Sequence, residues 1–327
     1  MHVLVPWAAC LSPACEAALP ELDKLDQMGR LPHVRALLNS LTASTRYNGD
    51  EYALLVPHEI LWAQAHGWSF PPDVAAPTVA TAAWLARQSG LPGHAWGLIT
   101  PCHWAMGHDS LTMLPPQDLQ LSQADSHALF EAARPWFESE GWQLHWVSPL
   151  QWLAHHPSLA DLPTASLDRV VGRNPDVWLP SDPRVRLVRR LQAEVQMLWY
   201  QHPVNAQRED QGLLSVNSFW LSGCGAWPDA SNEPASATRL YVEEGLRTAL
   251  MRMDIPAWLA AWESLDAGVL ALAHQAMLQG CDVRFSLCGE RHAVTLTAPA
   301  PVGTWQTLVQ RFRRPPSTRL SALLQSL

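Results

Sequence analysis

The pattern of apolar and polar residues predicts a chain in which helices and strands alternate. A short apolar run at residues 2–6 is typical of a buried first strand, and the Pro- and Ala-rich stretch up to about residue 90 shows helical spacing. The predicted helices of this stretch are 16–28, 31–41, 51–66 and 76–88. Further predicted elements are strands at 95–100 and 110–113, a helix that starts at the capping residue Ser122, and a strand at 143–147.

The segment 157–182 is rich in Pro, Asp and Ser, which predicts an irregular connection. It is the best candidate for a boundary in this chain of 327 residues, which exceeds the usual size of one domain. We therefore predict an N-terminal α/β region, residues 1–160, and a C-terminal α/β region, residues 161–327. The two regions could also form one continuous domain.

The helix after this connection has a clear predicted start and stop. Asp182 is placed to cap it, Pro183 fits its first turn, and Pro203 ends it. Later elements are a strand at 239–242, helices at 243–253 and 256–279, a hairpin of 281–287 with 292–297, and a last helix after Gly303. The predicted fold class is therefore α/β, with a mixed sheet flanked by helices.

The overall charge opposes a nucleic-acid partner. The net charge is −8 and the pI is about 5.9, whereas binding to a phosphate backbone needs a basic surface. No apolar run approaches the roughly 20 residues of a membrane helix, so we predict a cytoplasmic protein without a membrane partner. Arg184, Arg186, Arg189 and Arg190 form a local basic cluster, for which a salt-bridged or solvated helix face is favoured over an anion-binding patch.

Lysine and cysteine usage exclude several chemistries. The single lysine, Lys24, follows no glycine-rich loop, so a P-loop is excluded, and a Schiff-base lysine is not expected. The six cysteines form no CxxC pair, which is typical of free thiols in a reducing compartment and predicts neither zinc nor another cofactor. No Lys or Arg precedes the short apolar run before Cys10, so the N-terminus is interpreted as a strand and not as a lipoprotein signal.

Residues 198–225 hold the main candidate site. Donors and glycines suited to a phosphate or carboxylate follow the end of the helix: His202, Asn205, Arg208, Asn217, Gly223 and Gly225, with Glu194 or Gln196 as supporting partners. The alternative is structural: Asn205 or Arg208 would bond the last carbonyls of the helix, and Asn217 would fix a neighbouring loop. The structural alternative is favoured, because most buried polar groups serve structure.

Other single residues carry weaker chemical signals. Cys224 lies between two glycines, but no good helix start follows it, so a packed thiol is favoured over a nucleophile. His103, His155 and His156 lack partners at a ligand or triad spacing and are predicted to be loop or surface histidines. The aromatic residues at 96–104 could line a pocket, although core packing is favoured.

A run of residues in the candidate segment carries a family resemblance. These residues are His202, Pro203, Val204, Asn205, Arg208, Gly212, Val216, Asn217, Ser218, Trp220, Gly223 and Gly225. The run resembles the RpfE-type family of bacterial regulatory proteins, which is similar to cofactor-independent phosphoglycerate mutases of the archaeal type. The resemblance implies part of the alkaline-phosphatase and phosphoglycerate-mutase-like scaffold. It extends over about two thirds of the chain, with its specific core at 191–225, but a likeness of fold does not fix a function.

The sequence departs from the mutase pattern at the residues that would perform chemistry. Ser222 stands where that pattern has an arginine before Gly-x-Gly. The first strand leads into Trp7 without the Asp-Gly turn that binds metal in the family, and no Asp-His pair occurs. His108-Asp109 has the reverse order, and residues 290–292 are only a loose substitute. Because two divalent cations need several carboxylate and imidazole ligands at one point, we predict no metal centre.

These observations predict a non-catalytic regulatory protein that binds a small anionic ligand or a protein partner. The alternative is a phosphoryl-transfer or phosphoester-hydrolysing enzyme related to phosphoglycerate mutase, which would use residues that the patterns do not reveal. A purely structural role would require an exposed apolar patch rimmed by tryptophans. A homodimer is compatible with each of these roles, since two-fold dimers are the commonest assemblies.

Overall fold

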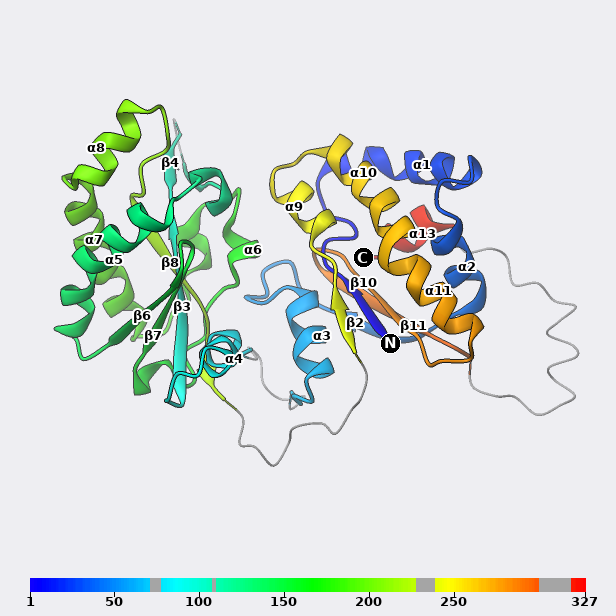
Figure 1. Cartoon of the computed structure of the whole chain (residues 1–327), viewed down its shortest axis with the longest axis horizontal. Coiled ribbons are helices and arrows are strands. Elements are labelled where there is room, and N and C mark those ends of the chain that lie inside the picture. Colours follow the sequence, from blue (N-terminus) through cyan, green and yellow to red (C-terminus); the bar gives the residue numbers. More distant parts are fainter. Residues whose placement is uncertain (71–77, 108–109, 228–238, 300–318) are drawn as a thin grey trace, which may run out of the picture. The chain divides into compact units, whose positions relative to one another are not determined.

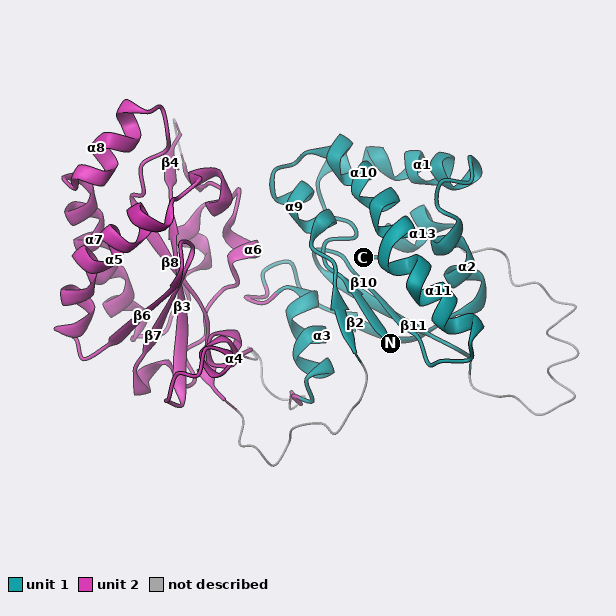
Figure 2. Ribbon diagram, in the orientation of Figure 1, with its two compact units in different colours: residues 1–52, 56–67, 233–327 teal, residues 53–55, 68–232 magenta. Residues whose placement is uncertain are grey.

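The computed structural model describes residues 1–70, 78–107, 110–227, 239–299 and 319–327 (Figure 1). The chain forms two compact units, shown in two colours in Figure 2. Unit 1 comprises Met1–Tyr52, Val56–Gly67 and Glu233–Leu327, and unit 2 comprises Ala53–Leu55 and Trp68–Asn232. Each unit has its own sheet and its own apolar core.

Unit 1 is built around a five-stranded sheet in the order β2-β11-β10-β1-β9. The strands are β1 (His2–Val5), β2 (Thr42–Asn48), β9 (Leu240–Val242), β10 (Arg284–Cys288) and β11 (His292–Thr297). β1 is parallel to β9 and β10, whereas β11 is antiparallel to β10 and β2. The predicted α/β class with a mixed sheet flanked by helices is confirmed.

Helices cover both faces of this sheet. One face packs against α1 (Pro13–Gln27), α2 (Pro32–Ser40), α9 (Gly245–Met251), α10 (Ile255–Leu265), the π-helical turn Asp266–Leu270, α11 (Ala271–Leu278) and α13 (Leu320–Leu324) (Figure 1). Val3 and Val5 of β1 point into this layer. Leu4, between them, points to the opposite face and packs with Leu61 of α3 (Pro57–Ala65), because side chains alternate along a strand.

Unit 2 contains a four-stranded antiparallel sheet in the order β6-β7-β3-β8. Its strands are β3 (Ala95–Cys102), β6 (Gln143–Ser148), β7 (Gln151–His155) and β8 (Ser218–Ala226). A separate hairpin joins β4 (Trp104–Met106) and β5 (Leu111–Met113). β8 is buried along almost its whole length, since it has helices on both faces.

The helices of unit 2 sandwich its sheet. α5 (Gln123–Glu138) and α7 (Val185–Tyr200) pack with Ile99, Phe219 and Leu221 on one face. α4 (Thr81–Gln88) packs against Trp96 and Leu153 on the other face. Short helical segments complete the unit: η1 (Pro116–Leu119), η2 (Pro157–Leu159), α6 (Leu167–Val170), η3 (Pro175–Trp178) and α8 (Pro203–Asp210).

The two units do not divide the chain near residue 160. Unit 1 combines both ends of the chain, because β1 pairs with β9 and β10, so the predicted regions 1–160 and 161–327 each contribute to both units. The Pro-rich connection 157–182 lies inside unit 2. Local composition marks an irregular segment but carries no information on the pairing of distant strands.

Several predicted elements are confirmed, and one strand, β2, was not predicted. β1 and the helix capped by Ser122 form as predicted, with Ser122 Oγ accepting the N–H of Asp125 at 3.0 Å. β2 lies between the predicted helices 31–41 and 51–66, where no strand was predicted. It is an exposed edge strand, so it lacks the buried alternating face that sequence patterns detect. The helix predicted after Gly303 and the pair His108-Asp109 lie outside the described residues.

The predicted cap of α7 is wrong. Arg184 is its N-cap residue, while Asp182 accepts the N–H of Arg184 at 2.8 Å in the turn before the helix. Pro203 follows the end of α7 as predicted, but it also opens α8, which the pattern did not predict. None of the helices in the described part of the chain is long and apolar enough to cross a lipid bilayer.

Candidate functional site

The turn between α7 and α8 uses its polar side chains to hold the backbone. His202 caps α8, since its Nδ1 accepts the N–H of Val204 at 3.3 Å. Asn205 Nδ2 donates to Trp199 O at 2.9 Å and to Val216 O at 2.8 Å, and Asn205 Oδ1 accepts the Val216 N–H at 2.8 Å. The predicted bond from Asn205 to a last carbonyl of the helix is therefore confirmed.

Arg208 is a buried cation that bonds to three separate segments. The residue is 1% exposed. Nε donates to Leu214 O at 2.9 Å, one terminal nitrogen lies 3.3 Å from Asp125 Oδ2, and the other donates to Leu119 O. The guanidinium therefore ties α8 to the start of α5, to η1 and to the loop that leads into β8.

Asn217 fixes the neighbouring strand β4. Its Oδ1 accepts the N–H of Trp104 at 2.7 Å and its Nδ2 donates to Trp104 O at 3.0 Å. Its own N–H donates to Cys102 O at 3.2 Å. The side-chain amide thus replaces a strand partner for Trp104, which confirms the predicted role of Asn217 in fixing a loop.

Gly223 and Gly225 allow α4 to approach β8. Gly223 has a φ of +59°, and a Cβ on it would lie 2.1 Å from Thr81 Oγ1. A Cβ on Gly225 would lie 2.5 Å from Ala80 Cβ. The glycines leave room for a helix within the unit, which accounts for them without a ligand.

The six predicted binding residues do not converge on one point. Asn217 precedes the first residue of β8 and Gly223 lies near its last, so they are separated by about 20 Å along the strand. Cys224 is buried between these glycines, its N–H donates to Thr164 Oγ1 at 3.3 Å, and burial raises the pKa of its thiol to about 12. The thiol is protonated at neutral pH, in keeping with the predicted packed cysteine.

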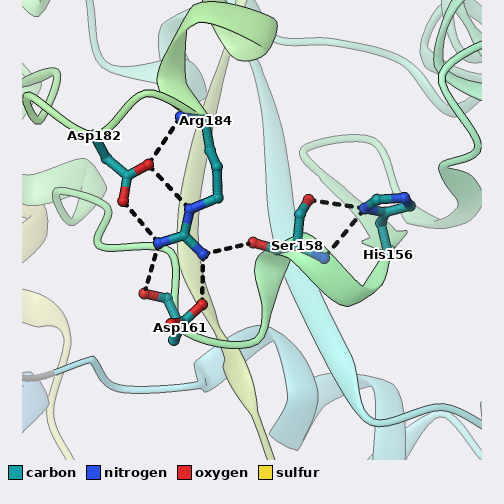
Figure 3. Close-up of polar contacts among 5 residues, drawn as sticks. All are labelled: His156, Ser158, Asp161, Asp182 and Arg184. Atoms are coloured by element: carbon teal, nitrogen blue, oxygen red, sulfur yellow. Dashed lines mark hydrogen bonds and ion pairs between the residues drawn. The ribbon is translucent and has the colours of Figure 1, made fainter.

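The basic cluster at the start of α7 contains an extended ion-pair network (Figure 3). Arg184 bonds both oxygens of Asp182, at 3.0 and 2.7 Å, and pairs with Asp161 on a separate loop. Arg190 pairs with Glu140. Ser158 accepts a bond from Arg184 through its carbonyl and contacts His156 Nδ1 through its hydroxyl at 2.8 Å. The preferred prediction of a salt-bridged face therefore holds for Arg184 and Arg190.

The carboxyl ends of the parallel strands in unit 1 form a second polar region, which was not predicted from the sequence. Trp7, just after β1, is buried with a φ of +54°, a left-handed conformation that is uncommon for a bulky residue. Ala8 N–H donates to Cys288 O at 2.7 Å, and Leu11 N–H donates to Glu290 Oε2 at 3.0 Å. A buried carboxylate therefore holds the turn that precedes α1. Cys10 lies in this turn, and Cys15 lies in the first turn of α1.

A pocket of about 330 Å³ opens in unit 1 beside α1, α2 and the start of α13. Its polar lining consists of Asp23, Asp26, Gln27, Arg35, Asn39 and Arg319. Ser321 Oγ donates to Asp23 Oδ2 at 2.6 Å, and Arg35 Nε donates to Asp26 Oδ1 at 2.8 Å. Sequence patterns could not reveal this pocket, because its residues come from both ends of the chain.

The described residues do not supply a metal site. In the ranges that the structure describes, no group of three or more His, Cys, Asp and Glu side chains could hold a metal ion. Residues 290–292, the loose substitute suggested by sequence, are used otherwise: Glu290 accepts the Leu11 N–H, and Arg291 Nε donates to His292 Nε2 at 2.8 Å. The two-metal centre of mutases does not fit this part of the chain, and we derive no step through it.

The first strand of unit 1 contains a buried histidine that should make stability depend on pH. His2 Nε2 shares a hydrogen bond with Ser286 Oγ at 2.8 Å, and Ser286 Oγ contacts Thr295 Oγ1 at 2.8 Å. Burial, followed by the positive charges of Arg284 and the N-terminus, lowers the pKa of His2 from 6.5 to about 4. Between pH 4 and pH 6.5, His2 is therefore protonated in the unfolded chain but neutral in the folded chain.

We expect the contribution of neutral His2 to the free energy of unfolding to be complete above pH 6.5 and to disappear as the pH falls towards 4. Between about pH 7.5 and pH 5, the wild type should lose about 2 kcal/mol more of its free energy of unfolding than the His2→Gln variant. Urea unfolding of both proteins at the two pH values measures this difference. Equal losses in both proteins would contradict the assignment to His2.

Comparisons with known proteins give matches among solved structures alone. No family model matches the chain, and no curated protein is similar to it. The cofactor-independent phosphoglycerate mutase from Thermoplasma acidophilum is similar in structure with 12% identity and a TM-score of 0.36, over 92% of this chain and 90% of that one. The PH0037 protein from Pyrococcus horikoshii is similar with 11% identity and a TM-score of 0.46, over 93% and 88% of the two chains. Similarities at this level describe neighbours in fold and give no information on activity.

Proposed function

We propose that the protein is a regulatory protein that binds a small anionic metabolite in the pocket beside α1, α2 and α13. The observation behind this proposal is the size and lining of the pocket. Its volume of about 330 Å³ falls within the range of small-molecule sites, which hold their ligands through a few convergent polar groups. The polar groups here are guanidiniums, amides and carboxylates, a set suited to binding.

The guanidinium groups of the lining are the feature that suits an anion. Asp26 pairs with Arg35, so these two charges offset each other, and Asp23 accepts the hydroxyl hydrogen bond of Ser321. Arg35 and Arg319 bring two guanidinium groups to the same pocket. Because a guanidinium matches the geometry of carboxylates and phosphates, the ligand class is a phosphorylated or carboxylated metabolite. The RpfE-type assignment, a cytoplasmic location and a homodimer belong to the same proposal.

A thermal-shift screen of the full chain with sugar phosphates, nucleotides and di- and tricarboxylates tests the proposal. A ligand that binds only the folded state raises the melting temperature. We expect Arg319→Ala to weaken binding of the best anion about tenfold, because it removes a charge-assisted hydrogen bond. Arg189→Ala is the matched control, since Arg189 is an exposed arginine of α7 in unit 2. No shift with any anion, or equal affinity in Arg319→Ala and wild type, would contradict the proposed site.

Phosphoester hydrolysis is the alternative function and is tested separately. We expect p-nitrophenyl phosphate to be hydrolysed no faster with the protein than without it when Mg²⁺, Mn²⁺ or Zn²⁺ is added. Metal analysis of the purified protein should give less than one divalent ion per chain. Stoichiometric metal together with metal-dependent hydrolysis would overturn the non-catalytic proposal and favour a phosphoryl-transfer enzyme.

A further inference from the structure

Two cysteines lie against each other where β1 leads into α1. Cys10 is in the turn after the strand, and Cys15 is in the first turn of the helix. The N–H of Cys10 donates to Cys15 Sγ at 3.4 Å. Ser12 lies between them: its Oγ contacts Cys10 Sγ at 3.3 Å and accepts the N–H of Cys15 at 3.1 Å. The turn therefore holds both sulfurs in one small cluster.

The two thiols differ in exposure and in acidity. Cys10 is partly exposed, whereas Cys15 is fully buried. The hydrogen bond with the thiol of Cys15 lowers the pKa of Cys10, and the bonds from Ser12 act in the same direction. The same bond raises the pKa of Cys15. Cys10 is therefore the thiol of the pair that loses its proton more easily, and Cys15 is the one that keeps it.

The other four cysteines do not share this arrangement. Cys102, Cys224 and Cys288 are buried, and burial raises the pKa of each thiol. Cys281 is exposed, and the nearest cysteine in sequence, Cys288, is buried at the end of β10. The pair at the start of α1 therefore combines a reachable sulfur with a neighbouring thiol, which is the arrangement that thiol oxidation requires.

We propose that Cys10 and Cys15 are a redox-active dithiol that hydrogen peroxide oxidises reversibly to a disulfide. In the first step the Cys10 thiolate attacks one peroxide oxygen. An S–O bond forms, the O–O bond breaks, and the leaving hydroxide takes up a proton to become water. In the second step Cys15 sulfur attacks Cys10 sulfur. An S–S bond forms, the S–O bond breaks, and the hydroxide leaves as water with the Cys15 proton.

The two steps together convert two thiols and one peroxide into one disulfide and two waters. The two electrons that peroxide gains come from the two sulfurs. A dithiol such as dithiothreitol reverses the change by thiol–disulfide exchange. This inference is independent of the anion pocket, because it concerns the turn after β1 and is measured without a ligand.

Peptide mapping of the full chain tests the inference directly. Lys24 is the first trypsin cleavage site, so a single peptide, residues 1–24, contains both cysteines. After brief treatment with peroxide and alkylation of the remaining thiols, we expect this peptide to be unalkylated and about 2 Da lighter than its reduced form. Dithiothreitol should restore two alkylated cysteines. We also expect Cys10 to lose its reduced form about tenfold faster than Cys281, the exposed control thiol in the same protein.

Two variants distinguish a pair from two independent thiols. In Cys15→Ser, Cys10 should stop at the sulfenic acid, which dimedone traps. In Cys10→Ser, Cys15 should stay reduced because it is buried. Wild-type mapping does not depend on the folding of either variant. A wild-type peptide that remains a dithiol while Cys281 is oxidised would overturn the proposal.

Discussion

Replacing Arg208 with alanine is expected to destabilise unit 2 by about 3 kcal/mol. The guanidinium donates to two backbone carbonyls and lies beside one carboxylate while it is 1% exposed. The carbonyl of Leu119 would lose a buried donor, and Asp125 would lose its nearby cation. The segments that lead into β8 would then be held by fewer bonds.

Hydrogen exchange read at the peptides that cover residues 198–226 measures this effect within unit 2. Unfolding of the whole chain is a less direct measure, because the two units need not unfold together. Arg189→Ala is the control, since an exposed arginine of α7 should change stability by less than about 0.5 kcal/mol. If both variants behave like the wild type, the network around Arg208 does not stabilise the unit.

Replacing Gly223 with alanine should destabilise unit 2 by a similar amount, about 3 kcal/mol. About 1 kcal/mol comes from the positive φ of +59°, which an L-residue adopts with strain. The rest comes from the overlap of the new Cβ with Thr81 Oγ1 at 2.1 Å, since overfilling a packed contact costs about 1–3 kcal/mol. Urea unfolding, with hydrogen exchange at the peptides of β8 and α4 as a second measurement, gives the sum of the strain and the overlap.

Two further variants separate strain from overlap. Gly212 has a φ of +71° but nothing within 4 Å of its would-be Cβ, so Gly212→Ala should cost only about 1 kcal/mol. The double variant Gly223→Ala with Thr81→Ala removes the hydroxyl at 2.1 Å and should recover part of the loss. Equal stability of Gly212→Ala and Gly223→Ala would show that α4 does not press on β8 as the structure describes.

The segment 202–225 acts mainly as a scaffold in unit 2. Asn205, Arg208 and Asn217 bond to backbone groups of their own unit, and Gly223 and Gly225 admit a helix. Their role as a site for a ligand stays a prediction. Such side chains are easily mistaken for a site in sequence, because the same donors that bind a phosphate also bind carbonyls.

The polar groups on which the two proposals rest lie in unit 1. The pocket beside α1 and α2, the Glu290 carboxylate at the turn before α1 and the cysteine pair are all formed by residues of this unit. The sequence pattern gave no indication that Cys10 and Cys15 lie together. Their spacing of five positions becomes informative only when the turn and the first helical turn bring the sulfurs together.

Local patterns by themselves determined the α/β class and most helices. Apolar spacing placed β1 and α7, Ser122 placed the start of α5, and Asn205 was correctly linked to the end of α7. These features depend on residues that are near neighbours in the chain, so their physical causes, capping and one-sided burial, are visible in a short window.

The tertiary structure alone decided how the chain divides and where its polar groups meet. β1 pairs with β10 near the other end of the chain, β2 forms an exposed edge strand, and Arg208 reaches Leu119 across 89 positions. The pocket of unit 1 likewise joins α1 with the start of α13. Strand pairing and buried hydrogen bonds are contacts between segments that the order of residues does not place together, so no local pattern contains them.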